Sequence, residues 1–173
     1  VTDRTDAYAD LPVLAQRDSV PYLGGSLRVQ YAACNSRKGR WSLDEPAGLL
    51  RVELPDPTSD SWRIGALQSF EKQRTQELVQ EYLRQYLPLF AARGVATPAA
   101  VRFRIMQSRW GSCSGRTHSL SFNARLCERP HAFIEYVVVH ELCHFLHGNH
   151  SADFWREVER YLPDWQARRK LGD

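Results

Sequence analysis

Three segments of the chain alternate apolar and polar residues with the period of two that is typical of a half-buried β-strand. They are Leu27–Tyr31, 99–107 and Leu120–Leu126. Two further short strands are expected at Arg40–Leu43 and Leu49–Leu54, because runs rich in Asn, Gly and Pro bound them. The first strand and these two would form an antiparallel meander over residues 21–57.

Helical spacing of apolar residues dominates the rest of the chain. It predicts a long helix over residues 61–87, which Pro88 and Gly94 would end. Segment 131–147 is apolar on nearly every face and should be a central, buried helix. Ser151 can cap a further helix at about 152–161. The Gly- and Ser-rich run 111–118 is expected to be a loop, and the whole pattern predicts one α+β domain.

Composition adds few constraints on function. The 173 residues are 43% hydrophobic and 25% charged, with a net charge of +3, as in ordinary globular proteins. No apolar run reaches the roughly 18 residues that span a membrane, so no membrane partner is expected. Arg168-Arg169-Lys170 is the main basic cluster, and we interpret it as a solvated helix end. A nucleic-acid partner is therefore not indicated by the sequence.

The four cysteines indicate a reducing compartment. Cys34, Cys113, Cys127 and Cys143 form no C-x-x-C pair, which argues against a cysteine zinc knuckle. We expect them to be reduced and mostly buried, with Cys143 in the core. The N-terminus shows no signal-peptide pattern, so a cytoplasmic location is the expectation.

Chemistry is concentrated in the run His140-Glu141-Leu142-Cys143-His144. On a helix, His140 and His144 project from one face one turn apart, which is the separation that two ligands of one zinc ion need. Glu141 would lie beside the metal and accept the proton of an attacking water. Polar side chains in an apolar helix are costly without partners, which also favours the metal interpretation over a chance motif.

The third ligand is less determined by the pattern. His150 completes the spacing H-E-x-x-H-x5-H, and a turn at Gly148 could bring it to the metal. His147 shares the helical face with His140 but should lie a full turn too far along the axis. A downstream carboxylate, Asp153 or Glu157, is the other alternative. We favour His150, on geometry and spacing together.

Four other residues are weaker candidates for outer contacts with the metal site or substrate. Tyr136 lies one turn before His140 and could donate to an oxyanion or to a ligand. Arg109, Asn123 and His118 fall at or after strand ends that should border the cleft. Packing is the favoured explanation of Tyr136, and for the other three a solvated face explains the pattern equally well.

Several linked motifs resemble those of the YgjP-like metallopeptidases, zincins that are related to SprT-type domains. The matching stretches are Ser108–Ser114, Leu120–Leu126, Tyr136–His144, Asn149–Ser151 and Phe154-Trp155. The resemblance implies a zincin fold with an antiparallel or mixed twisted sheet, a long backing helix, an active-site helix and a short C-terminal helix. It also implies one Zn²⁺ ion held by His140, His144 and His150, and Glu141 as the general base.

The resulting hypothesis is a zinc-dependent peptidase that acts on a peptide or protein substrate. The catalytic core would cover residues 58–173, with the meander before it and residues 1–20 as a loose arm. An edge strand formed by residues 120–126 could hold an extended peptide. Two alternatives stay open, a DNA-associated SprT-like protease and a non-catalytic metal-binding module, although Glu141 argues against the latter. The sequence does not indicate the oligomeric state.

Overall fold

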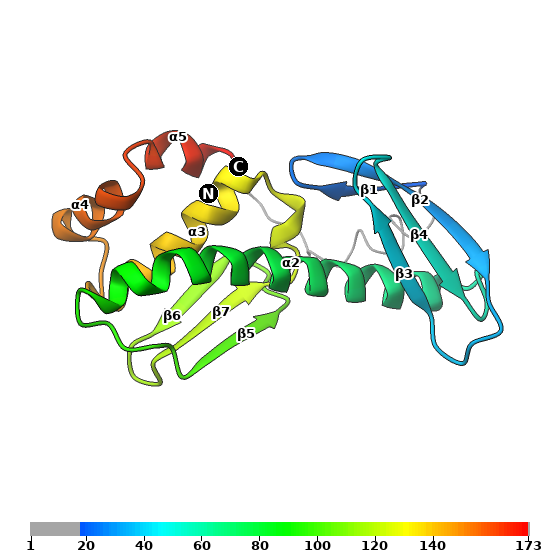
Figure 1. Ribbon diagram of the computed structural model, residues 1–173, viewed down its shortest axis with the longest axis horizontal. Helices are drawn as coiled ribbons and strands as arrows, with labels where there is room; N and C mark the ends of the chain where they lie inside the picture. Colours follow the sequence, from blue (N-terminus) through cyan, green and yellow to red (C-terminus); the bar gives the residue numbers. More distant parts are fainter. Residues whose placement is uncertain (1–17, 173) are drawn as a thin grey trace.

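One long helix connects two sheets and two layers of shorter helices (Figure 1). The computed structural model describes residues 18–172, so most of the arm expected at residues 1–20 lies outside the described residues. The elements are β1 (Ser19–Tyr22), β2 (Gly25–Ala33), β3 (Arg40–Asp44), β4 (Leu49–Leu54), α2 (Asp60–Ala91), β5 (Ala100–Arg104), β6 (Gly111–Ser114), β7 (Ser119–Asn123), the 3₁₀ turn η1 (Leu126–Glu128), α3 (His131–Cys143), α4 (Ala152–Tyr161) and α5 (Trp165–Lys170). The predicted α+β class is confirmed.

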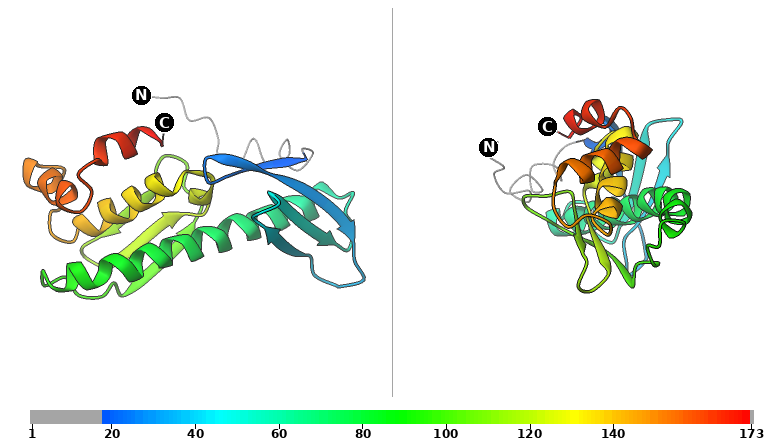
Figure 2. Two further views of the ribbon diagram at one scale, coloured as in Figure 1. Left: turned by 45° about the horizontal axis from the view of Figure 1, so that its top comes forward. Right: turned by 90° about the vertical axis from the view of Figure 1, so that its left-hand side faces the viewer.

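Helix α2 is the backing element of the molecule. Its first half contacts β3 and β4, and its second half contacts α3 and β5, so both sheets pack against the same helix (Figures 1 and 2). The side chain of Ser59 caps its first turn by accepting a hydrogen bond from the backbone N–H of Trp62. No helix among residues 18–172 has the length and apolar character needed to cross a bilayer.

The expected end of this helix at residue 87 is wrong, because α2 continues through Pro88 to Ala91. Proline lacks the N–H of one helical hydrogen bond and its ring crowds the preceding turn, so the last turn depends on packing for its stability. Phe90, which follows it, is fully buried and stacks on Tyr161 with ring centroids 4.6 Å apart. Burial of such a ring contributes about 1.5–3 kcal/mol, enough to hold the last turn in place.

The N-terminal sheet has the strand order β1-β2-β4-β3, and the predicted antiparallel meander is wrong. β2 and β4 pair in parallel, and β3 folds back onto the outer edge of β4. The burial of β4 explains this order. Leu50, Val52 and Leu54 are fully buried or nearly so, which places the strand in the centre of the sheet.

The second sheet has the order β5-β7-β6 and corrects two further expectations. β7, within the segment expected to be an edge strand, is central and buried at every position. The edge strands are β5 and β6, and β6 lies in the segment expected to be a loop and pairs antiparallel with β7. Its sequence Gly-Ser-Cys-Ser lacks the apolar alternation by which strands are predicted.

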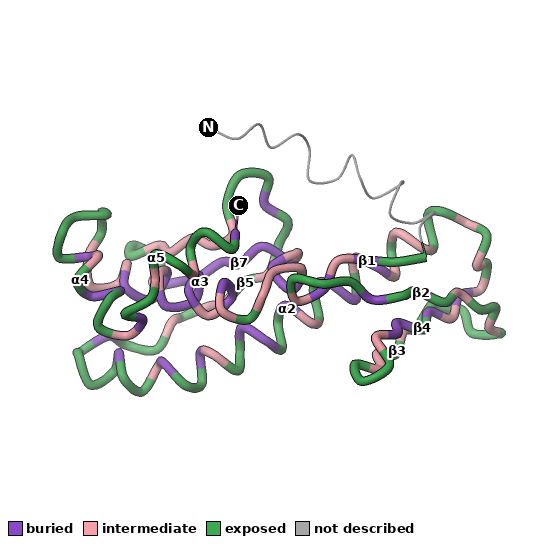
Figure 3. Tube along the Cα trace, turned by 90° about the horizontal axis from the view of Figure 1, so that it is seen from above, coloured by how far each residue is buried: buried purple, intermediate pink, exposed green. Residues whose placement is uncertain are grey.

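Helix α3 is surrounded by other elements of the C-terminal part of the chain and by the long helix. It contacts α2, β6, α4 and α5. Figure 3 shows that buried residues follow α3, β7 and one side of α2. The helix ends at Cys143 rather than at 147, and turns with hydrogen bonds from Phe145 and Leu146 follow it. The predicted cap is present: Ser151 accepts a hydrogen bond from the N–H of Phe154 at the start of α4.

A buried carboxyl group between α2 and η1 makes stability depend on pH. Glu71 is 5% exposed, and its pKa is raised from 4.5 to about 8, mainly by burial and also by Glu128, while Arg125 opposes the rise. The folded carboxyl therefore holds its proton more tightly than the unfolded one. Its contribution to stability is fully present below pH 4.5 and is lost as the pH rises through 8.

Glu71→Gln should consequently stabilise the protein in mildly alkaline solution. We expect the free energy of unfolding at pH 8 to rise by on the order of 1–3 kcal/mol relative to the unsubstituted protein, because no charge has to be buried. The difference should shrink towards pH 4.5. Urea denaturation at several pH values measures it, and a difference that does not change with pH would contradict the assignment.

Candidate active site

Three histidines meet at the C-terminal end of α3. One ring nitrogen from each of His140, His144 and His150 lies within 4.8 Å of the other two. The Nε2 atoms of His140 and His150 are 3.0 Å apart. A tetrahedral zinc ion with Zn–N bonds of about 2.0–2.1 Å spaces its nitrogen ligands by roughly 3.4 Å, so this group can hold such an ion.

The other ring nitrogens of two of these histidines are also engaged. The Nδ1 atom of His140 lies 3.3 Å from the hydroxyl of Tyr136. The Nδ1 atom of His144 lies 3.1 Å from the carbonyl oxygen of His147. Contacts of this kind fix the orientation of metal-binding imidazoles and leave Nε2 for the metal.

The other residues considered as the third metal ligand do not join His140 and His144. The side chain of His147 is not part of the three-histidine group, and its carbonyl contacts His144 instead. Asp153 pairs with Arg156 on the exposed side of α4. Glu157 is buried and pairs with Arg93 at 2.7 Å. The structure therefore brings His150, and none of the three competitors, to the histidine pair.

The surroundings of His140 and His144 favour their neutral forms. The pKa of His140 is lowered to about 3, mainly by burial and also by the neighbouring His144 and His150. Burial also lowers the pKa of His144. A neutral imidazole has a free lone pair, so these side chains are in the protonation state that binds a metal cation at neutral pH.

Glu141 lies on the side of α3 that faces β6. It is 6% exposed, and burial raises its pKa to about 8, an effect that the charge of Arg109 opposes. A divalent cation held by the histidines would favour the ionised carboxylate. There is no room for a side chain at Gly111: a Cβ atom there would lie 2.7 Å from both Cγ and Oε1 of Glu141.

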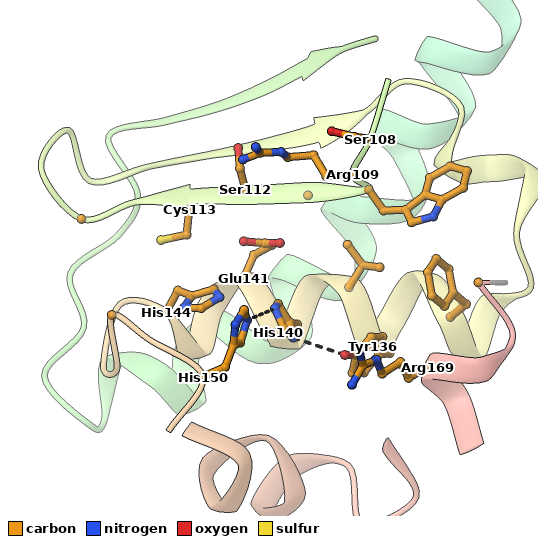
Figure 4. A pocket seen from close by; sticks show the side chains of 17 residues that line it. Ser108, Arg109, Ser112, Cys113, Tyr136, His140, Glu141, His144, His150 and Arg169 are labelled. Atoms are coloured by element: carbon orange, nitrogen blue, oxygen red, sulfur yellow. Dashed lines mark hydrogen bonds between the residues drawn. The ribbon is translucent and has the colours of Figure 1, made fainter. Parts of the chain in front are cut away.

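A cleft of about 720 Å³ connects the histidines, Glu141 and β6 (Figure 4). From the histidines it extends along α3 past Val137 and Tyr136 to Phe133 and Trp110. Its walls are thus partly apolar and partly polar, as in sites that bind an organic ligand in a fixed orientation. Figure 4 shows Glu141 pointing towards β6 while the three histidines lie together at one end.

Of the weaker candidates, Tyr136 and Arg109 line this cleft, and Asn123 and His118 do not. Asn123 donates hydrogen bonds to the carbonyl oxygens of Met106 and Arg109, at 2.8 and 3.1 Å, and so holds the loop before β6. The Nε2 atom of His118 lies 2.8 Å from the carbonyl oxygen of Ala96, and its ring packs on Phe145. His118 is therefore a packing residue.

Two features of the cleft were not predicted from the sequence. Gly111 belongs to a stretch that carried the family resemblance, but only the contact with Glu141 gives it a role. Arg169 lines the cleft beside Tyr136, although its sequence context indicated a solvated helix end. Of the cysteines, all of them free, Cys127 and Cys143 are buried as expected, whereas Cys113 is half-buried and lines the cleft.

Comparison with known proteins places the chain among peptidases. The model of the YgjP-like metallopeptidase domain matches residues 3–171. A solved structure, that of the metallopeptidase zymogen abylysin from Pyrococcus abyssi, is 21% identical with a TM-score of 0.43, and the match covers 56% of this chain and 87% of that one. No curated protein matches.

Proposed function

The chain belongs to the YgjP-like metallopeptidase family, and on this premise we propose that it is a zinc peptidase with His140, His144 and His150 as ligands and Glu141 as general base. The observation that carries the proposal is the meeting of three histidines beside a buried carboxyl group in one cleft. A structural zinc site would be closed by four protein ligands. Only three lie together among residues 18–172, which leaves room for water or substrate.

A zinc ion bound there would polarise the scissile carbonyl and lower the pKa of a water molecule. The residues of the chain then have separate tasks. Glu141, next to His140 on α3, would accept the proton of the attacking water and pass it to the leaving amine. Tyr136 would hold the ring of His140 through the contact with Nδ1. Gly111 allows Glu141 to approach β6, where the scissile bond would lie.

Substrate would bind as an extended strand along β6. This strand pairs with β7 on one side and forms the edge of its sheet. It also contacts α3, so a peptide added to the free edge would pass the histidines and Glu141. Strand addition uses backbone hydrogen bonds and tolerates many sequences.

The proposal is tested by metal analysis together with peptide digestion. The purified protein is expected to bind about one zinc ion per chain, as a three-histidine site should. Zinc-loaded protein should cleave peptides in a mixed-sequence library, and a chelator should stop the cleavage. A protein that binds zinc but cleaves none of the peptides would be a non-catalytic metal-binding module. A protein that binds no zinc would contradict the site itself.

A further inference from the structure

Two consecutive arginines on α5 have different surroundings. Arg168 forms an ion pair with Glu135, which attaches α5 to α3, and a second one with Asp164 at the start of its own helix. Arg169 lines the cleft, and within residues 18–172 no carboxylate forms an ion pair with it. Arg168 therefore serves to attach α5 to α3, whereas Arg169 makes no ion pair that would attach the helix.

The guanidinium of Arg169 lies over one aromatic ring, which itself belongs to a stack of rings. The guanidinium lies 5.7 Å from the ring centroid of Trp155. Trp155 stacks on Trp165 at 4.3 Å and on His150 at 5.5 Å, with interplanar angles of 15° and 19°. A stacked guanidinium keeps its N–H groups free in the plane of the group, where they can bind another ligand.

The chain just after the C-terminal end of α5 is also packed against α3. Gly172 packs so closely against Phe133 that a Cβ atom there would lie 2.1 Å from the ring. Because α5 is docked on α3, Arg169 lies at a defined place beside Tyr136 (Figure 4).

The charge of the cleft is complementary to an acidic ligand. Arg109 and Arg169 line the cleft as cations, and Glu141 is the one carboxylate among the lining residues described. Glu141 is buried against β6, whereas Arg169 is exposed beside Tyr136. A substrate that enters the cleft would thus meet positive charge before it reaches the buried carboxylate.

We propose that Arg169 is a specificity-determining residue that binds a carboxylate of the peptide substrate on the Tyr136 side of the scissile bond. The inference rests on the proposed peptidase function and names the substrate class of that site. The carboxylate is either an Asp or Glu side chain near the scissile bond or the free C-terminus of a short peptide. A guanidinium binds both through paired hydrogen bonds.

The experiment compares two peptide libraries of the same mixed sequence, one with free C-termini and one with C-terminal amides. Zinc-loaded protein digests both, and mass spectrometry maps the cleaved bonds. We expect peptides with a suitably placed carboxylate to be cleaved about tenfold more efficiently than neutral ones, the effect of one charge-assisted hydrogen bond. A preference that survives amidation identifies acidic side chains, and one that is lost identifies the free C-terminus.

Arg169→Gln should lower cleavage of the carboxylate-bearing peptides to the level of the neutral ones and so abolish this preference, because the residue binds the carboxylate. Arg169→Lys should keep part of it. Lys170→Gln, which removes the next charge of the same helix, is the matched control and should keep all of it. In a Glu141→Gln background, Arg169→Gln should also weaken binding of a labelled acidic peptide, measured by fluorescence anisotropy.

The outcomes separate this inference from the function on which it rests. Protein that cleaves no peptide of either library overturns the peptidase function and the inference with it. Cleavage without preference for a carboxylate, or a preference that Arg169→Gln leaves intact, overturns the inference alone. An equal loss on acidic and neutral peptides in Arg169→Gln would show a structural role and would likewise overturn it.

Discussion

Glu141→Gln is expected to lower kcat/KM for peptide hydrolysis by roughly 10²–10⁴-fold, which is the usual contribution of a general base. Glutamine has nearly the shape of glutamate, so the close contact with Gly111 is preserved. It cannot accept the proton of the attacking water. Because Glu141 is not one of the three clustered nitrogen ligands, zinc affinity should stay unchanged.

The measurement is steady-state kinetics on one cleaved peptide, with zinc content determined on the same samples. Glu159→Gln is the matched control, since it removes an exposed carboxylate from α4 and should leave the kinetics unchanged. A loss of zinc in Glu141→Gln would show that the carboxylate contributes to the metal site. Retention of more than a tenth of the activity would mean that another group accepts the proton.

Local patterns predicted the elements that carry the chemistry. The buried helix with His140 and Glu141, the turn that follows it and the cap at Ser151 all depend on residues close together in the chain. The family and the α+β class, which the resemblance and the overall pattern indicated, are confirmed. Such features need no knowledge of which distant segments pair.

Long-range pairing is what the sequence did not reveal. The parallel pairing of β2 with β4 depends on the burial of β4 against α2, which strand periodicity does not report. β6 has no apolar alternation, and it forms because β7 offers a free edge beside it. Arg169 lies in the cleft only because Arg168 and Gly172 dock α5 on α3.

His150→Ala should weaken zinc binding by more than the roughly 10–100-fold that loss of an outer partner costs, because it removes a direct ligand. Peptide hydrolysis at limiting zinc should fall in parallel. His150 is exposed and follows the end of α3, so its substitution should leave the metal-free fold intact. Competition with a chromophoric chelator measures the affinity, and thermal denaturation of the metal-free protein checks the fold.

His147→Ala is the control that distinguishes a ligand from a neighbour. The structure gives His147 a role through its carbonyl oxygen, which an alanine retains, so His144 should keep its contact at Nδ1. We therefore expect nearly unchanged zinc affinity in this variant. The reverse result, tight binding in His150→Ala and loss in His147→Ala, would require the segment after α3 to turn differently when the metal binds. The pair of variants thus tests the turn at residues 148–149 as directly as it tests the ligand, since only that turn brings the Nε2 atom of His150 to 3.0 Å from that of His140.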